Sequence, residues 1–373
     1  MKLKFNSQFD KIFIRVCVLS ISVLTLAIII LILTDTGDYT ETPSYPEPEL
    51  EIVAEPEEEV EYIDTRPLSL FTGEHIDEDD LYRRPIAVVI NNIRDAWPHS
   101  GITSADVIYE VLAEGDVTRL IGIFQSEMPE TVGPIRSARD YFIDFSLNHG
   151  AIFVHHGSSP SGLDRMHNLN VARLDGMFLE GNAFWRDTSN PYWANRGTRS
   201  LEHSSYTGWE NVQTQISVSN FRDYIDNPEI GFSFDELSTD LATSGSAHHI
   251  TVPFSASYPR TFIFDEELNQ YRVENREGPH MDALSQEQVT VANVLVQFTS
   301  IWIVDDAGRR GVATVGEGRG YLAREGYVVP VRWAKSGHSL PMHWYFENGD
   351  PVVLAPGATW INVVDNSVGI TFE

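Results

Sequence analysis

Cysteine is nearly absent from this sequence. The 373 residues include a single cysteine, Cys17, which lies inside a hydrophobic run near the N-terminus. The rest of the chain can therefore form no disulfide bond, and a structural zinc site with cysteine ligands is excluded. Exported proteins of Gram-positive-type bacteria commonly lack cysteine, so this absence leaves secretion open.

Basic residues are also scarce. The chain has 26 Lys and Arg against 54 Asp and Glu, a formal net charge of −28. Residues 1–15 carry +3, residues 35–64 carry −12, and residues 65–373 carry the remaining −19. A surface of this sign repels nucleic acids and anionic lipid headgroups, so we expect no nucleic-acid partner. A small basic pocket stays compatible with this charge, because a local potential can oppose the net charge.

Charge is missing altogether from residues 16–33, which read VCVLSISVLTLAIIILIL. Eighteen apolar residues are just enough to cross the hydrocarbon core of a membrane as a helix. Basic residues precede this run and acidic residues follow it, so the positive-inside rule places the N-terminus in the cytoplasm. We predict a cytoplasmic tail at 1–15, a single transmembrane anchor at 16–34 and extracytoplasmic domains beyond it. The alternative is a cleaved signal peptide. A small-x-small cleavage site would then follow the apolar run, and no clear one does.

The segment after the predicted anchor has no lysine or arginine. Residues 35–64 hold 12 carboxylates and several prolines. Like charges and prolines keep such a segment extended and unpacked, so residues 35–65 are predicted to be a disordered acidic linker.

Two folded domains are predicted beyond the linker. In residues 66–240, buried-strand runs at 86–90, 107–112, 120–124 and 151–154 alternate with helical patterns at 137–147, 161–169 and 209–224. This alternation indicates an α/β or α+β domain with a mixed sheet. Residues 248–373 contain short β-rich runs separated by Gly, Asp and Asn turns, which indicate a smaller, mainly β domain, as a small barrel or curled sheet.

Several stretches of both domains resemble the YerB-like family of bacterial surface lipoproteins. They are Arg84–Asn92 (RPIAVVINN), Ala105–Gly115 (ADVIYEVLAEG), Thr118-Arg119, Gly133–Phe142 (GPIRSARDYF), Val154–Pro160 (VHHGSSP) and Pro356–Ile361 (PGATWI). The resemblance covers roughly residues 67–373. It implies a mixed N-terminal domain and a β-rich C-terminal domain on an extracytoplasmic protein, and it implies no particular reaction. This chain departs from the family at the anchor, because no lipobox cysteine follows the apolar run.

Arginines gather in the segment Gly133–Asp140. A helix that starts at Ser137 would place Arg136 at its positive end and Arg139 one turn in, and Arg119 would be a third contributor. Guanidinium groups at a helix N-terminus suit a phosphate or carboxylate ligand. The alternative is that acids such as Asp140 or Glu114 neutralise these arginines in internal salt bridges.

Histidines provide the second candidate group. His155 and His156 follow an apolar strand, at the strand end where ligands tend to bind, and one of them could act as an acid or base. His203 belongs to a further polar cluster. No H-x-H or HExxH spacing is present, so we predict neither a metal site nor a cofactor. The alternative for these histidines is a structural, hydrogen-bonded role.

We therefore predict that the N-terminal domain binds an anionic cell-wall component or an envelope protein through an Arg/His cleft. The candidate residues are Arg119, Arg136, Arg139, Asp140, His155, His156, Glu114 and His203. The alternative is a cell-wall-active enzyme, a glycopolymer transferase or hydrolase, that uses the same cleft. A single anchor followed by an Arg-x-x-Arg-Asp patch also resembles the LytR-CpsA-Psr phosphotransferases, which bind polyprenyl pyrophosphate through arginines. No motif identifies a catalytic residue.

Overall fold

A buried strand, β1 (Ile86–Asn91), organises the fold because both of its faces are apolar. Ile86, Val88 and Ile90 point to one face of the sheet, and Ala87 and Val89 point to the other, as the two-residue period of a strand requires. The computed structural model describes residues 64–189, 199–226, 232–235 and 245–373. The predicted tail, the anchor and nearly all of the acidic linker lie outside these residues. Within them, no helix is both long enough and apolar enough to span a membrane.

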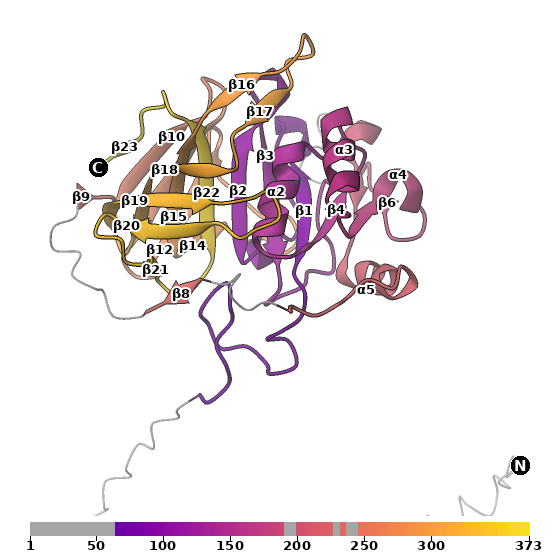
Figure 1. Cartoon of the computed structure of the whole chain (residues 1–373), viewed down its shortest axis with the longest axis horizontal. Coiled ribbons are helices and arrows are strands. Elements are labelled where there is room, and N and C mark those ends of the chain that lie inside the picture. Colours follow the sequence, from indigo (N-terminus) through magenta and orange to yellow (C-terminus); the bar gives the residue numbers. More distant parts are fainter. Residues whose placement is uncertain (1–63, 190–198, 227–231, 236–244) are drawn as a thin grey trace, which may run out of the picture. The chain divides into compact units, whose positions relative to one another are not determined.

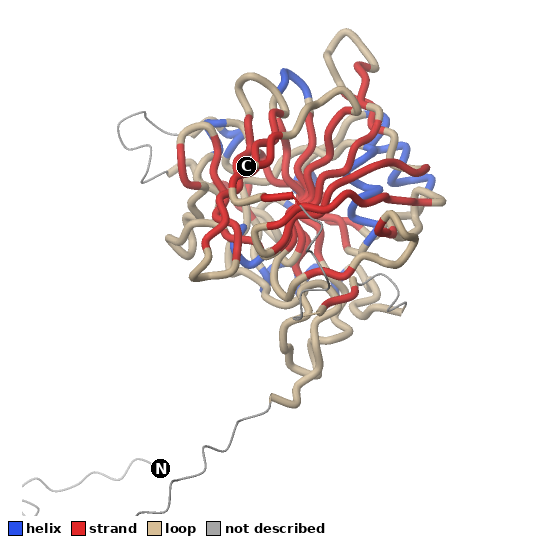
Figure 2. Tube along the Cα trace, turned by 90° about the vertical axis from the view of Figure 1, so that its left-hand side faces the viewer, coloured by secondary structure: helices blue, strands red, loops and turns tan. Residues whose placement is uncertain are grey.

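The large sheet has 11 strands and draws on both predicted domains (Figure 1). Its order is β20-β19-β18-β15-β22-β2-β3-β1-β4-β5, with β9 paired to β19. Its other strands are β2 (Val107–Leu112), β3 (Thr118–Phe124), β4 (Ile152–His155), β5 (Arg173–Asp175), β9 (Gly245–Ser246), β15 (Asn293–Thr299), β18 (Gly316–Arg324), β19 (Tyr327–Lys335), β20 (His343–Phe346) and β22 (Thr359–Asp365). Parallel and antiparallel pairs occur together, so the mixed sheet is confirmed. Figure 2 shows the strong twist of its strands.

A second sheet of six strands lies wholly in the C-terminal half, in the order β13-β12-β11-β10-β23 with β14 paired to β12. These strands are β10 (His249–Pro253), β11 (Pro259–Asp265), β12 (Gln270–Asn275), β13 (Gly278–Pro279), β14 (Thr290–Val291) and β23 (Thr371–Phe372). Three two-stranded pairs complete the β structure: β6 (Trp185–Arg186) with β7 (Ser205–Tyr206), β8 (Ser233–Phe234) with β21 (Val353–Leu354), and β16 (Ile301–Ile303) with β17 (Arg310–Val312).

The C-terminal half is mainly β, as predicted, but its strands do not all join in one separate barrel or sheet. They divide between the two sheets, because β22 pairs in parallel with β2 on one side and with β15 on the other. Residues Ile63–Glu373 accordingly form a single compact unit.

Helices lie on both faces of the large sheet. The helices are α2 (Asp140–Asn148), α3 (Pro160–Asn168), α4 (Gly176–Leu179) and α5 (Trp209–Val218), with 3₁₀ turns η1 (Arg94–Ala96), η2 (Ile102–Ser104), η3 (Glu114–Asp116) and η5 (Leu201–His203). Helices α2 and α3 cover one face of the large sheet, and the small sheet and helix α5 cover the other. Tyr141, Phe142 and Phe145 of α2 pack on the face that carries Val89. The opposite face packs against α5 and against apolar residues of the small sheet such as Phe262 and Tyr271.

A buried ion pair links the two halves between the sheets. The Arg260 guanidinium of β11 donates to the Glu110 carboxylate of β2 at 2.7 and 3.1 Å, and both side chains are 2 % exposed. Arg260 also donates to His280 Nδ1 at 3.0 Å, so the other ring nitrogen, Nε2, carries the proton and donates to His99 at 2.8 Å. His99 then donates to the main-chain oxygen of Asn91 at 2.9 Å. Glu110, Arg260, His280 and His99 are therefore joined in one hydrogen-bonded chain that ends at the main chain of Asn91.

Candidate functional site

The segment Gly133–Asp140 is extended rather than helical over most of its length. Ile135 bridges to Ile90, the Arg136 N–H donates to Val89 O, and Ala138 bridges to Ser158. These tertiary hydrogen bonds hold the backbone extended, so α2 begins at Asp140 and not at Ser137. The expectation that Arg136 lies at the start of this helix is therefore wrong.

Arg119 and Arg139 share one carboxylate, that of Glu114. Arg139 Nε lies 2.5 Å from Glu114 Oε1, and Arg119 Nη2 lies 3.4 Å from Glu114 Oε2. Both guanidinium groups also donate to the main-chain oxygen of Ser137. Burial and the neighbouring Arg139 lower the pKa of Arg119 to about 10. Burial alone would raise the pKa of Glu114, but the two arginines outweigh it and lower the pKa. This group is an internal salt-bridge cluster.

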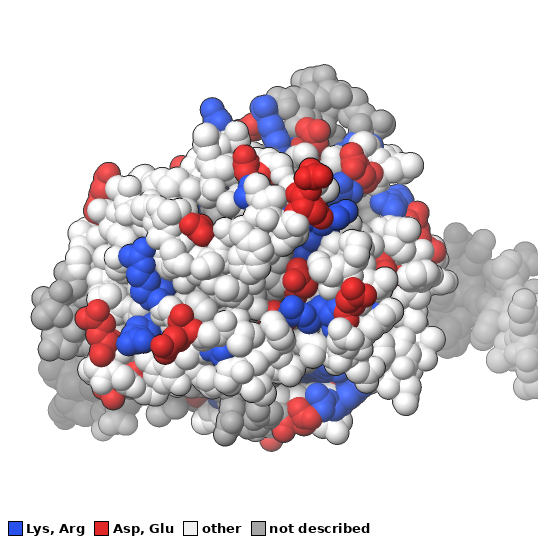
Figure 3. Space-filling view, turned by 45° about the horizontal axis from the view of Figure 1, so that its top comes forward, with Lys and Arg blue, Asp and Glu red and all other residues white. Residues whose placement is uncertain are grey.

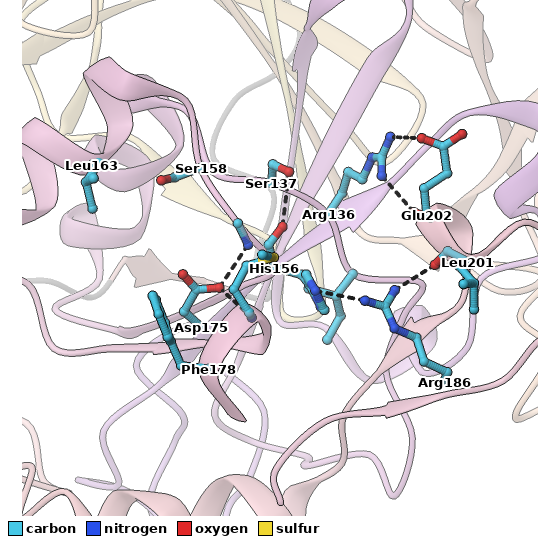
Figure 4. A pocket seen from close by; sticks show the side chains of 13 residues that line it. Arg136, Ser137, His156, Ser158, Leu163, Asp175, Phe178, Arg186, Leu201 and Glu202 are labelled. Atoms are coloured by element: carbon cyan, nitrogen blue, oxygen red, sulfur yellow. Dashed lines mark hydrogen bonds and ion pairs between the residues drawn. The ribbon is translucent and has the colours of Figure 1, made fainter. Parts of the chain in front are cut away.

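An open cleft lies beside a different set of residues (Figure 4). It has a volume of about 550 Å³ and lies at the carboxyl ends of the parallel strands β4 and β5, where α/β sheets usually bind ligands. Its lining residues are Ile135, Arg136, Ser137, His156, Gly157, Ser158, Leu163, Asp175, Met177, Phe178, Arg186, Leu201 and Glu202.

Two arginines hold the turn η5 at the edge of the cleft. Arg136 donates to the main-chain oxygen of Glu202 at 2.8 Å, and Arg186 donates to the main-chain oxygen of Leu201 at 2.6 Å. Each arginine also binds a glutamate: Arg136 binds Glu202 at 2.8 Å, and Arg186 binds Glu180 at 2.8 Å. The hydrogen bonds to main-chain carbonyls fix the guanidinium groups. The glutamate side chains, in contrast, are 59 % exposed for Glu202 and 47 % exposed for Glu180.

His156 lies next to Arg186 and is fixed at both ring nitrogens. Arg186 donates to its Nε2 at 2.9 Å, so Nδ1 carries the proton and donates to Ser205 Oγ at 2.8 Å. Burial and the adjacent Arg186 lower the pKa of His156, which favours the neutral ring. Gly176 leaves room for this ring, because a Cβ there would lie 2.3 Å from His156 Nδ1.

The remaining candidate residues lie outside the cleft lining. His155 is fully buried and donates from Nδ1 to Gly157 O at 2.8 Å. Burial lowers the pKa of both His155 and His203. His203 accepts from Asn91 at 2.8 Å and lies 3.6 Å from Glu202. Asp140 lies 3.8 Å from Arg165. Of the eight candidates, the structure thus places Arg136 and His156 together in the cleft.

Sequence reasoning missed Arg186, Glu202 and Phe178. Arg186 and Glu202 come from β6 and η5, which lie 30 or more residues after His156, and no local pattern connects them. Phe178 belongs to the single-turn helix α4, and its 83 % exposure cannot be read from the sequence. In the ranges that the structure describes, no group of three His, Cys, Asp or Glu side chains is arranged to hold a metal ion.

Comparison with known proteins identifies the family. Residues 71–222 match the N-terminal domain of the "protein of unknown function (DUF3048)" family, and residues 250–361 match its C-terminal domain. The chain is 30 % identical over 298 residues to the "Putative lipoprotein YerB" of Bacillus subtilis (strain 168), covering 79 % of this chain and 85 % of that protein. The crystal structure of the YerB protein from Bacillus subtilis superimposes with a TM-score of 0.71 at 29 % identity, covering 82 % of this chain and all of the other. The predicted resemblance is thereby confirmed, and the chain belongs to the DUF3048 family, in which it is similar to YerB.

Proposed function

We propose that this chain is a membrane-attached extracytoplasmic protein that binds an anionic cell-wall component or envelope partner through the cleft. Attachment is supported by the apolar run at residues 16–33 and by the word lipoprotein in the name of its relative. The acidic segment at 35–65 would then serve as the spacer between membrane and folded unit.

The observation that carries the proposal is the pair of arginines, Arg136 and Arg186, at one open cleft. Main-chain carbonyls hold both guanidinium groups in place, so little side-chain freedom remains to be lost when a ligand binds. Guanidinium groups bind carboxylates and phosphates through bidentate hydrogen bonds. Their present partners, Glu202 and Glu180, are exposed to solvent, so an incoming anion can displace them.

The apolar rim of the cleft also supports ligand binding. Phe178, Met177 and Leu201 are all exposed, and all three line the same hollow. Large apolar side chains that gather at a concave site, with a few polar groups beside them, are typical of binding sites.

The hydrogen bonds of His156 favour binding over catalysis. A general base needs a free lone pair that faces the substrate, but Arg186 occupies Nε2 and the Nδ1 proton is donated to Ser205. The enzyme alternative therefore has no observation in its favour beyond the presence of the cleft.

The test is retention of the purified full chain on purified peptidoglycan and on isolated wall polymers. We expect Arg136→Ala/Arg186→Ala to lower the affinity at least tenfold, because each charge-assisted hydrogen bond is worth about 1.5–3 kcal/mol. The control, Arg272→Ala/Arg332→Ala, removes two surface arginines outside the cleft, which pair with other acids. Equal retention of both double variants and wild type, with unchanged melting temperatures, would refute the proposal.

A further inference from the structure

The cleft offers both signs of charge: each of its two arginines is paired with a glutamate, and its lining also includes Asp175, which accepts from the main-chain N–H groups of Gly157 and Met177. Arg136 is paired with Glu202, and Arg186 is paired with Glu180, while His156 next to Arg186 is hydrogen-bonded in a neutral form. Figure 4 shows Arg136 next to Glu202, and Arg186 below them, next to His156 and Leu201. The site is therefore not a simple basic pocket.

A ligand with negative charge only is poorly suited to these pairs. If its anions take the arginines, Glu202 and Glu180 lose their partners and lie next to like charge. Residues 65–373 also carry a net charge of −19, which repels a polyanion before it reaches the cleft. The face in Figure 3 agrees with this, because its basic and acidic side chains lie next to one another and form no basic patch.

A ligand with both signs leaves neither the arginines nor the glutamates of these two pairs without a partner. Its carboxylates can bind Arg136 and Arg186, and its ammonium groups can bind the carboxylates that these arginines release. Exposed Phe178, Met177 and Leu201 lie around the charged groups and suit aliphatic side chains between the charges of the ligand. Alternating charges spaced by small apolar groups are the chemistry of a short peptide.

We infer that the cleft selects a peptide segment that carries both carboxylate and ammonium groups, rather than a polyanion. This inference rests on the proposed function, since it names the ligand class of the same site. It also makes Glu180 and Glu202 determinants of specificity. In a site for anions only, these glutamates would merely compete with the ligand for the arginines.

The sign of the effect of removing these carboxylates tests the inference. The probes are the peptide Ala-Glu-Lys-Ala with free termini and inorganic polyphosphate, titrated by calorimetry into the full chain. We expect wild type to bind the peptide more tightly than polyphosphate, and Glu180→Gln/Glu202→Gln to weaken peptide binding at least fivefold. The control Glu266→Gln/Glu317→Gln removes two exposed carboxylates outside the cleft and should leave both affinities unchanged.

Other outcomes overturn the inference. If Glu180→Gln/Glu202→Gln binds the peptide as well as or better than wild type, the glutamates are competitors and the site is anion-only. If wild type prefers polyphosphate, or binds no peptide at millimolar concentration, the inference also fails. In each case, retention on wall polymers that depends on Arg136 and Arg186 would leave the proposed function standing, and its absence would remove both.

Discussion

Replacing Arg260 with methionine should be among the most destabilising single changes in the fold. Arg260 supplies two of the four hydrogen bonds to the Glu110 carboxylate, the others coming from Asn92 at 3.2 Å and Thr118 at 2.7 Å. The variant therefore leaves a carboxylate buried between the sheets with no cation beside it. It also removes the donor to His280 Nδ1.

The expected loss is about 3–5 kcal/mol, as for other buried ion pairs that lose one partner. A unit of about 300 residues has an unfolding entropy near 0.6 kcal/mol per degree, so the melting temperature should fall by about 5–8 °C. In the double variant Glu110→Gln/Arg260→Met, the uncompensated charge is gone. Because a buried amide is less costly than a buried unpaired carboxylate, we expect about half of the loss to be recovered.

Urea denaturation followed by tryptophan fluorescence measures both free energies, with Arg332→Met as the control. Arg332 lies 3.5 Å from Glu317 on the surface, where both side chains are mostly exposed, so its loss should cost less than about 1 kcal/mol. A loss below about 1 kcal/mol for Arg260→Met, or a double variant less stable than the single one, would refute this reasoning.

Three further outcomes are expected. Burial lowers the pKa of Lys335 to about 8, so the folded state loses the Lys335 proton at lower pH than the unfolded state does. The wild-type free energy of unfolding should therefore rise by up to about 3 kcal/mol between pH 8 and pH 10.5. Lys335→Met should lose this rise in the same urea titration. The lowered pKa of Glu114 contributes stability above pH 4.5 that is lost as the pH falls. Glu114→Gln should therefore be less stable than wild type by about 1–3 kcal/mol at pH 7, and this difference should narrow below pH 4.5. A difference in unfolding free energy that is constant with pH would contradict this. Gly176→Ala should displace the His156 ring and weaken ligand binding at least fivefold, whereas Gly369→Ala, which has open space beside it, should bind like wild type.

The strands of the N-terminal half were predictable because buried strands appear in the sequence as runs of apolar residues. β1 and β2 are near-continuous apolar runs, and both were predicted to within one residue of their ends. β18 was missed, because Gly318 and Gly320 interrupt any apolar pattern there. The structure gives the reason: a Cβ at Gly318 would clash with Trp333 of β19, and a Cβ at Gly320 would clash with Val296 O of β15 and with Trp344.

The candidate site was predictable only in part. The segment around Arg136 was recognised as important, but its extended backbone depends on hydrogen bonds to β1 and to the loop after β4. The partner of Arg136 lies 66 residues away, in η5. Sequence spacing carries no information about such a pairing. The residues that line the cleft could therefore be identified only from the tertiary structure.

β22 is almost the last strand of the chain, yet it lies in the middle of the large sheet (Figure 1). Until residues 359–365 are present, β2 and β15 each keep an unpaired edge and the sheet stays in two pieces. A chain that is synthesised amino end first cannot close this sheet before residues 359–365 have emerged. The two pieces of the sheet therefore join only after almost all of its other strands have been made.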